Sequence, residues 1–169
     1  MTLKLSSKGQ VVIPSSVRKK YKMAAHSRLE LVDLAGEIVL VLMPSPRYLL
    51  DTSALICYLA EEKEAGEVAK VKTASSIPFI ALTELYYLLW EKRGKAEADN
   101  IYGLVRSWRL PTVFPNERIL LTAGRIKAQH GLGIADSYIA ACAHETGETL
   151  LTKDNDYRSL QKEIAIQFL

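Results

Sequence analysis

The sequence predicts an α/β fold: an open parallel sheet with helices on both faces, preceded by a small β-rich dimerisation module. From Arg47 onward, short apolar runs typical of strands alternate with longer amphipathic segments typical of helices. Before that point the runs are mostly β-type, and the stiff segment Pro44-Ser45-Pro46 separates the two patterns. We therefore expect two domains, residues 1–46 and residues 47–169.

Composition narrows the class of protein. The chain has 169 residues, of which 49% are hydrophobic and 24% charged, as in a soluble globular protein and unlike a disordered one. No apolar run approaches the length of a membrane span, and the first residues lack the apolar core of a signal peptide. Cys57 and Cys142 form neither a disulfide framework nor a zinc-type cluster, so we expect buried reduced thiols. We expect a cytoplasmic protein with no membrane partner.

The first 46 residues contain β-type runs around one short basic helix. A turn-rich stretch, Ser6-Ser7-Lys8-Gly9, separates the first two runs, and Pro14 ends the second. A unit of this size cannot bury enough apolar surface alone, so we expect dimerisation to stabilise it. The expected elements are strands Leu3–Leu5 and Val11–Ile13, a helix capped by Ser15 or Ser16 and running through Tyr21, and a hairpin of Arg28–Asp33 and Glu37–Leu42 around the turn Leu34-Ala35-Gly36.

Positive charge is concentrated at the N-terminus. Residues 1–23 hold six basic residues and no acidic residue, whereas residues 47–169 hold 15 basic and 16 acidic residues. Such a block indicates an anionic partner for the N-terminal module. A solvated basic face kept for solubility explains the same block equally well.

The second domain alternates strands and helices in the order of an open parallel sheet. Leu85, Leu88 and Leu89, for example, fall at helical spacing and give their helix one buried face. The expected strands are Tyr48–Leu50, Ile77–Ile80, Thr112–Phe114, Thr149–Leu151 and Ile164–Phe168. The expected helices are Thr52–Ala60, Glu64–Ala74, Leu82–Lys92, Lys95–Trp108, Arg118–Gln129 and Ser137–His144.

Acidic residues follow the carboxyl ends of these strands, where open parallel sheets place their functional crevice. Asp51 comes directly after the first strand, and Glu84 lies past the second, in the expected first turn of its helix. Asp136 caps the helix 137–144, and Asp154 and Asp156 follow the fourth strand. Each alone has an ordinary explanation, because carboxylates at helix starts cap amides and aspartates are common in turns.

Convergence of these acids on one crevice favours a metal site instead. Like charges raise one another's pKa and destabilise the fold unless a cation compensates them. An all-oxygen carboxylate set suits hard Mg²⁺ or Mn²⁺, and no histidine cluster competes for zinc. The sequence therefore predicts a divalent-metal site formed by Asp51, Glu84, Asp136 and Asp154.

The N-terminal residues resemble a known family. Ser7-Lys8-Gly9-Gln10-Val11-Val12-Ile13-Pro14, followed by Val17-Arg18-Lys19, is similar to the AbrB/SpoVT/MazE family of swapped-hairpin DNA-binding modules. The resemblance implies that two chains interlock their hairpins and that basic residues contact operator DNA. Clustered lysines and arginines release counterions from phosphates, and arginine also reads guanine edges. The implied DNA contacts are Lys4, Lys8, Gln10, Arg18 and Lys19.

The second domain resembles a PIN domain of the VapC toxin type over essentially all of residues 47–169. The similarity rests on four motifs in order, Leu50-Asp51-Thr52-Ser53-Ala54, Ala81-Leu82-Thr83-Glu84-Leu85, Gly133-Ile134-Ala135-Asp136-Ser137-Tyr138-Ile139-Ala140-Ala141 and Leu151-Thr152-Lys153-Asp154-Asn155-Asp156-Tyr157.

This second resemblance implies a catalytic site. Four acids, with Asp156 as an auxiliary metal-site acid, would hold one or two Mg²⁺ or Mn²⁺ ions and cleave an RNA substrate. The hydroxyls of Thr52, Ser53 and Thr152 would orient a metal-bound water. In the implied mechanism the metal activates water to attack a phosphodiester and stabilises the developing charge. The four acids are Asp51, Glu84, Asp136 and Asp154.

Several alternatives stay open at this stage. The leading hypothesis is a ribonuclease toxin fused to an antitoxin-like module that binds DNA and autoregulates transcription, assembled as a homodimer or higher homo-oligomer. The alternative is a transcriptional regulator whose PIN half is inactive, inhibited or used for oligomerisation. Asp51 arrives seven residues after Pro44, which leaves no room for an inhibitory tail, so inhibition would need a second chain such as a separate antitoxin. A weaker third hypothesis is a structure-specific DNA nuclease.

Two further sets of residues have two explanations each. Tyr86, Tyr87 and Trp90 either stack RNA bases or pack between helices. Lys153 is either a phosphate contact or a solvated charge.

Overall fold

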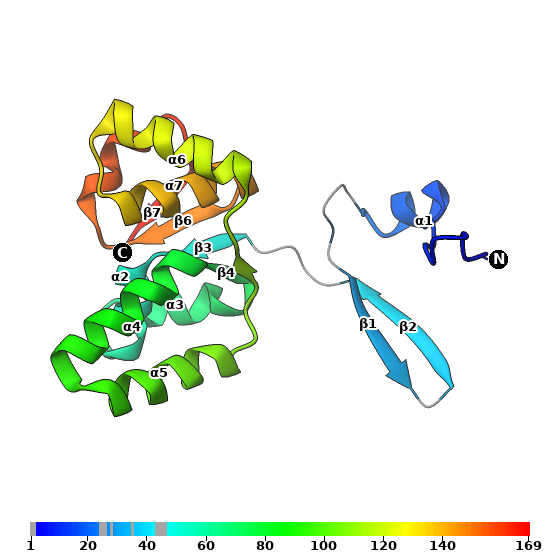
Figure 1. The fold of residues 1–169 in the computed structure, drawn as a ribbon, viewed down its shortest axis with the longest axis horizontal. Helices are drawn as coiled ribbons and strands as arrows, with labels where there is room; N and C mark the ends of the chain where they lie inside the picture. The colour runs from blue at the N-terminus through cyan, green and yellow to red at the C-terminus, as the bar shows by residue number, and fades with distance from the viewer. Residues whose placement is uncertain (1–2, 24–26, 28, 35, 43–46) are drawn as a thin grey trace. The chain divides into compact units, whose positions relative to one another are not determined.

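The structure, a computed structural model of the whole chain, describes residues 3–23, 27, 29–34, 36–42 and 47–169. The chain divides into two compact units, residues 1–45 and residues 46–169, which are described separately below (Figure 1). Arg28 and Ala35 of the predicted hairpin, and the segment Pro44-Ser45-Pro46, lie outside the described residues.

The N-terminal unit begins with a tight turn. The backbone N–H of Ser6 donates to the carbonyl of Gln10 at 2.9 Å, and that of Gly9 donates to the carbonyl of Ser6 at 2.9 Å. Gly9 has a φ of +71°, a conformation that only glycine adopts without strain. The runs on either side, predicted as strands Leu3–Leu5 and Val11–Ile13, are not strands within the described residues of this chain. A strand needs a neighbour for its backbone hydrogen bonds, and neither run is paired here.

Helix α1 (Ser15–Lys20) follows directly. The prediction that Ser15 or Ser16 caps it is wrong, because Pro14 occupies the N-cap position and no side-chain cap hydrogen bond is formed. Proline fits there because its fixed φ suits the helix start and its missing N–H removes an unpaired donor.

Strands β1 (Leu29–Leu34) and β2 (Glu37–Leu42) form the antiparallel hairpin, with Leu34 paired opposite Glu37. β1 therefore extends one residue into the predicted turn. Apolar side chains on both faces of this ribbon are exposed in the single chain, with Leu31 at 62% and Ile38 at 72% on one face and Leu34 at 55% on the other. A two-stranded ribbon with unburied apolar faces is marginal by itself.

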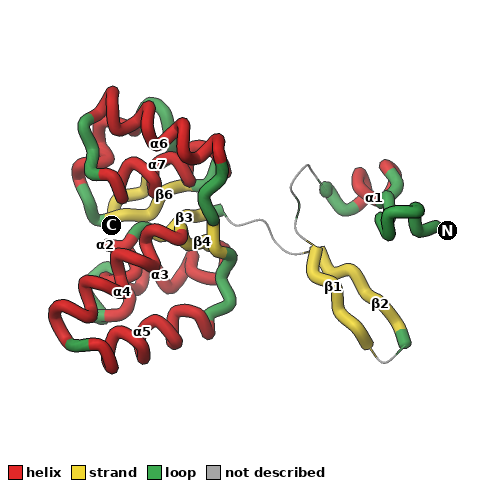
Figure 2. Tube along the Cα trace, viewed as in Figure 1, coloured by secondary structure: helices red, strands yellow, loops and turns green. Residues whose placement is uncertain are grey.

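The second unit confirms the predicted α/β class. Its five parallel strands run in the order β5-β4-β3-β6-β7. Helices flank the sheet, with α6 and α7 on one side and α2 to α5 on the other (Figure 1). Figure 2 shows the same arrangement, with the strands between two layers of helix. The strands are β3 (Tyr48–Leu50), β4 (Ser75–Pro78), β5 (Thr112–Val113), β6 (Thr149–Thr152) and β7 (Ile166–Phe168). The helices are α2 (Thr52–Leu59), α3 (Ala65–Val71), α4 (Phe79–Arg93), α5 (Lys95–Ser107), α6 (Glu117–His130) and α7 (Ile134–Thr146), with short 3₁₀ turns η1 (Lys72–Ala74) and η2 (Asn155–Leu160).

The boundary between β4 and α4 differs from the prediction. The sequence predicts a strand that ends at Ile80, but β4 ends at Pro78, and α4 begins at Phe79. Proline closes the strand because it has no N–H for the ladder and is tolerated at a helix start. Phe79 and Ile80 are apolar enough to resemble a strand in sequence.

The core lies between the sheet and its helices. Leu49 and Leu50 of β3 and Leu150 and Leu151 of β6 are fully buried, as continuous apolar runs of a doubly covered parallel sheet should be. Within the described part of the chain, none of the helices combines the length and the hydropathy needed to span a bilayer.

Truncating this core should be costly for stability. We expect Leu150→Ala to lower the free energy of unfolding by about 2–5 kcal/mol, because it leaves a cavity in the central sheet. Urea denaturation followed by circular dichroism measures the change. Leu121→Ala, at a position 64% exposed, is the matched control and should change stability by less than about 0.5 kcal/mol. Equal midpoints for the two variants would contradict the core assignment.

Candidate metal centre

The predicted acidic residues gather at the carboxyl edge of the parallel sheet. Asp51 follows β3 directly and is the N-cap of α2, and Asp154 follows β6 as the N-cap of η2. Glu84 lies on α4 and Asp136 on α7. Three of them, Asp51, Glu84 and Asp136, influence one another electrostatically, whereas Asp154 and Asp156 act more weakly on Asp136 from the side.

Asp51 is the most constrained of these acids. Its side chain is only 4% exposed. Its Oδ1 accepts a hydrogen bond from the backbone N–H of Thr52 at 2.7 Å, and its Oδ2 accepts from the hydroxyls of Ser53 at 2.6 Å and Thr152 at 2.7 Å. Burial raises the pKa of Asp51 above its usual value despite these three donors, which favour the charged form. The hydrogen bonds thus fix the orientation of the Asp51 carboxylate, while burial destabilises its charged form.

Glu84 approaches Asp51 from the neighbouring helix. It lies in the second turn of α4, and not in the first turn as predicted, because α4 begins earlier than expected. Its Oε2 accepts from the hydroxyl of Thr52 at 2.7 Å. Burial is the largest cause that raises the pKa of Glu84, and the negative charges of Asp136 and Asp51 raise it further.

Asp136 enters from the other side of the sheet. It lies in the first turn of α7, and the prediction that it caps this helix is wrong because Gly133 is the N-cap. Its Oδ1 accepts from the phenol of Tyr157 at 3.2 Å. Burial, followed by the negative charge of Asp51, raises the pKa of Asp136.

Tyr157 and Gly133 shape this corner of the site, and sequence reasoning assigned neither a role. Tyr157 is fully buried, and burial together with nearby carboxylates raises its pKa well above the usual value, so its phenol stays a donor at neutral pH. A Cβ on Gly133 would lie 2.5 Å from Oδ2 of Asp136. Both residues stand inside the motifs that carry the acids, which is the only sequence signal for them.

Asp154 and Asp156 flank the inner acids. Asp154 is half-buried, and its Oδ1 accepts from the backbone N–H of Asp156 at 2.8 Å. Its own N–H donates to the hydroxyl of Thr152 at 2.9 Å. Asp156 is exposed. These contacts connect the outer acids to Asp51 through one shared threonine.

The residues of the inner site fit a hard divalent cation. All the side chains that would bind the ion offer oxygen atoms, and within the described residues no salt bridge involves any of the three inner acids. Burial raises the pKa of each, and the negative charge of Asp51 adds to the rise at Glu84 and Asp136. An ion such as Mg²⁺ would supply the missing positive charge through one or two carboxylates and several waters.

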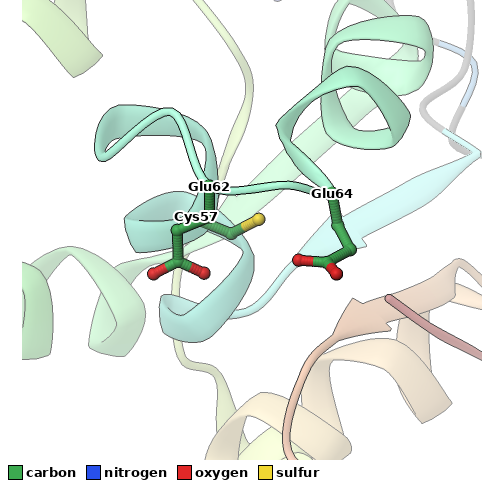
Figure 3. A group of neighbouring side chains, drawn as sticks. All are labelled: Cys57, Glu62 and Glu64. Carbon is green, nitrogen blue, oxygen red and sulfur yellow. The ribbon is translucent and has the colours of Figure 1, made fainter.

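A second acidic cluster is already compensated. Ligand atoms of Cys57, Glu62 and Glu64 lie within 4.8 Å of one another, closer than the inner acids as a set, at the end of α2 and in the loop to α3 (Figure 3). The ammonium of Lys153 bonds Glu62 at 2.6 Å and Glu64 at 3.0 Å, and these carboxylates raise its pKa. Burial raises the pKa of the Cys57 thiol, which disfavours the thiolate that a metal needs. The ammonium of Lys153 therefore supplies the positive charge that a metal ion would otherwise supply in this cluster.

Lys153 also reaches the main site, through its backbone. Its N–H donates to the hydroxyl of Ser53 at 2.9 Å, and that hydroxyl donates to Asp51. Its ammonium is engaged by two carboxylates, so neither a free phosphate contact nor a simply solvated charge describes it.

The aromatic residues of α4 divide between packing and exposure. Tyr86 packs edge-on against Trp90 and Tyr102, and its hydroxyl donates to Asp99 at 2.7 Å. Tyr87 and Trp90 are 45% and 46% exposed. Tyr86 thus joins α4 to α5, whereas the other two rings remain partly accessible.

The residues predicted to contact DNA lie in the N-terminal unit. All of them are exposed, on the turn and on α1 or beside it. They are Lys4, Lys8, Gln10, Arg18 and Lys19.

Comparison with known proteins gives one family match. Residues 48–163 match the family model of the PIN domain. No curated protein matches the sequence significantly.

Solved structures share the fold at low sequence identity. VapBC2 from Rickettsia felis, bound to a DNA fragment from its promoter, matches with a TM-score of 0.60 and 18% identity over 72% of this chain and 98% of that chain. VapBC-1 from nontypeable Haemophilus influenzae matches with a TM-score of 0.57 and 23% identity over 72% of this chain and 96% of that chain. FitAcB from Neisseria gonorrhoeae matches with a TM-score of 0.56 and 19% identity over 72% of this chain and 96% of that chain.

The raised pKa of Asp51 predicts a gain in stability when its charge is removed. The folded state binds this proton more tightly than the unfolded chain, whose value is near 3.8. The stability that protonated Asp51 contributes to the fold is therefore present at low pH, and it is lost as pH rises through the pKa of the folded state. In EDTA at pH 7 we expect Asp51→Asn to unfold with a free energy about 1 kcal/mol higher than wild type, an advantage that disappears below about pH 4.

Chemical denaturation across this pH range measures the difference. Asp99→Asn is the control, because hydrogen bonds from Lys95 and Tyr86 lower the pKa of Asp99 and its removal should destabilise the fold at neutral pH. The same sign for both variants would contradict the electrostatic account.

Proposed function

Since this chain belongs to the PIN-domain family, we propose that it is a divalent-metal-dependent endoribonuclease of toxin–antitoxin type, fused to an antitoxin-like DNA-binding module. PIN domains are generally nucleases. The observation that carries the proposal is the inner acidic site. Three carboxylates, one directly after β3 and the others on α4 and α7, meet at the carboxyl edge of the sheet with raised pKa values, and among the described residues none of them forms a salt bridge.

Each residue of this site has a proposed role. Asp51, Glu84 and Asp136 would hold Mg²⁺ or Mn²⁺, and Asp154 with Asp156 would enlarge the negative field for a second ion. When bound, the ion activates water and neutralises charge that develops on the phosphate. Ser53 and Thr152 fix Asp51, and Thr52 joins Glu84 to the same corner. These hydroxyls hold the acids in place before any substrate binds, so the acids do not have to reorient during the reaction.

The N-terminal unit is proposed to dimerise and to bind operator DNA. Its hairpin exposes apolar side chains on both faces, and burying them against a second copy would supply the stability that the unit lacks alone. The exposed basic residues then face the phosphates of a duplex. Two structural neighbours of this chain were solved as VapBC complexes bound to DNA, and these complexes motivate the proposed DNA-binding role.

Control of the nuclease is proposed to come from another chain. Asp51 is the seventh residue after Pro44, which leaves too few residues for a segment that crosses the sheet edge and covers the acids. A separate antitoxin is the simplest partner of this kind. A harmless protein without nuclease activity would favour the second candidate, a DNA-binding regulator that uses its PIN half for assembly.

The nuclease proposal predicts metal-dependent cleavage of single-stranded RNA. We expect full-length protein to cleave in Mn²⁺ but not in EDTA, and Asp51→Asn or Asp136→Asn to lower the rate roughly 100-fold or more, because each removes a charged ligand. Gel analysis of a labelled RNA, with DNA of the same sequence as a second substrate, gives the rates.

Glu67→Gln is the matched control, since Glu67 is an exposed acid on α3 paired with Lys70. It should cleave like wild type. Undiminished cleavage by the Asp51 and Asp136 variants would show that the site is elsewhere, and preference for DNA would favour the DNA-nuclease hypothesis.

The N-terminal proposal predicts that one exposed residue controls assembly. Ile38→Asp places a charge at a position 72% exposed in the single chain, so it should be harmless to a monomer but should break a dimer that buries the hairpin. Light scattering coupled to size exclusion measures the mass, and we expect it to halve. Arg18→Ala should keep the mass and weaken operator binding, with a shallower salt dependence. An unchanged mass for Ile38→Asp would count against the hairpin dimer.

A further inference from the structure

The three inner acids differ in how the protein holds them. Asp51 accepts one backbone and two hydroxyl hydrogen bonds, and Glu84 accepts a hydroxyl hydrogen bond from Thr52. Asp136 lies in the first turn of α7, whose N-cap is Gly133, a residue with no side chain to form a cap hydrogen bond. Among the described residues, its hydrogen-bond donor is the phenol of Tyr157 at 3.2 Å.

Tyr157 is unusually placed for a polar side chain. It is the largest of the fully buried side chains and lies in η2, directly after the strand whose last residue, Thr152, holds Asp51. A buried phenol needs a partner, because a hydroxyl that loses its water without gaining another hydrogen bond destabilises the fold. The partner here is a carboxylate on a different helix, 21 residues away in sequence. A ring without the hydroxyl would fill the same space, so packing alone does not account for the phenol.

Gly133 leaves space for the other oxygen of the same carboxylate. Its φ of −53° is open to any residue, so backbone strain does not call for glycine here. The constraint is space, because a Cβ would meet Oδ2 of Asp136 at 2.5 Å, far inside van der Waals contact. Gly133 is exposed, so the space it leaves serves the carboxylate and not the core.

We propose that Tyr157 and Gly133 are positioning residues that together set the orientation of the Asp136 carboxylate for metal binding. This inference rests on the proposed nuclease site. The phenol holds Oδ1 and the missing Cβ leaves room for Oδ2, so the carboxylate keeps one direction relative to Asp51 and Glu84. Every inner acid then accepts a hydrogen bond from a hydroxyl. Ser53 and Thr152 donate to Asp51, Thr52 donates to Glu84, and Tyr157 donates to Asp136.

The test compares full-length wild type with Tyr157→Phe and Gly133→Ala by three measurements: Mn²⁺ affinity by calorimetry, kcat and KM for RNA cleavage, and Tm in EDTA. We expect both variants to bind Mn²⁺ roughly 10–100-fold more weakly, the size typical of lost outer hydrogen bonds at metal sites. At non-saturating Mn²⁺, kcat should fall with KM for RNA nearly unchanged, because neither side chain contacts the substrate. Tyr138→Phe makes the same change on α7 itself and should match wild type in every measurement.

The outcomes separate this inference from the proposed function. Wild-type cleavage with unchanged Mn²⁺ affinity and kcat in both variants overturns the positioning role and leaves the nuclease intact. A lower Tm with unchanged metal affinity identifies Tyr157 as a core residue only, which also overturns it. If Tyr157→Phe fails to fold, Gly133→Ala at its exposed position still decides the matter. A wild type that neither binds Mn²⁺ nor cleaves RNA or DNA removes the proposed nuclease, and the positioning role with it.

Discussion

The buried carboxylate of Asp51 is the constraint on which the catalytic end of this fold depends. It joins β3 to α2 as an N-cap and joins β3 to β6 through Thr152, 101 residues later in the chain. The same hydroxyls that fix it also organise its neighbours, since Thr152 accepts from Asp154 and Ser53 accepts from Lys153. A charge buried this far is tolerated because three donors surround it, and it remains costly because, in the described part of the chain, no cationic side chain forms a salt bridge with it.

Two acidic clusters in one domain illustrate the difference between a satisfied and an unsatisfied set of charges. Glu62 and Glu64 share the ammonium of Lys153, and that cluster ties the loop after α2 to the end of β6. Asp51, Glu84 and Asp136 accept hydrogen bonds from hydroxyls instead, and burial, with neighbouring negative charge at Glu84 and Asp136, raises their pKa values, so the metal-free fold gives up stability there. Local strain of this kind is characteristic of sites shaped for a ligand and not for stability alone.

The N-terminal unit differs from the catalytic end, which buries charge, because it leaves apolar surface exposed. Hairpin residues that would form a core lie open in the single chain, and the runs at residues 3–5 and 11–13 have the composition of strands without a strand beside them. Both features have one explanation if a second chain supplies the missing neighbour. Local sequence preference cannot create a strand where no partner backbone exists.

The α/β class, the order of the elements and the position of Asp51 could be predicted from the sequence, because strand, acid and helix start are adjacent in the chain and local rules govern them. The sequence misplaced β4, α4 and the cap of α7, where Pro78 and Gly133 decide boundaries that hydrophobic pattern does not reveal. Only the tertiary structure decided that Thr52, Ser53 and Thr152 hold carboxylates, that Lys153 lies between two glutamates, and that Tyr157 reaches Asp136. Apart from the local contact of Ser53 with Asp51, these contacts join residues from 21 to 101 positions apart, and a spacing of that kind has no periodic signal in a sequence. They exist because the sheet brings its strand ends to one edge.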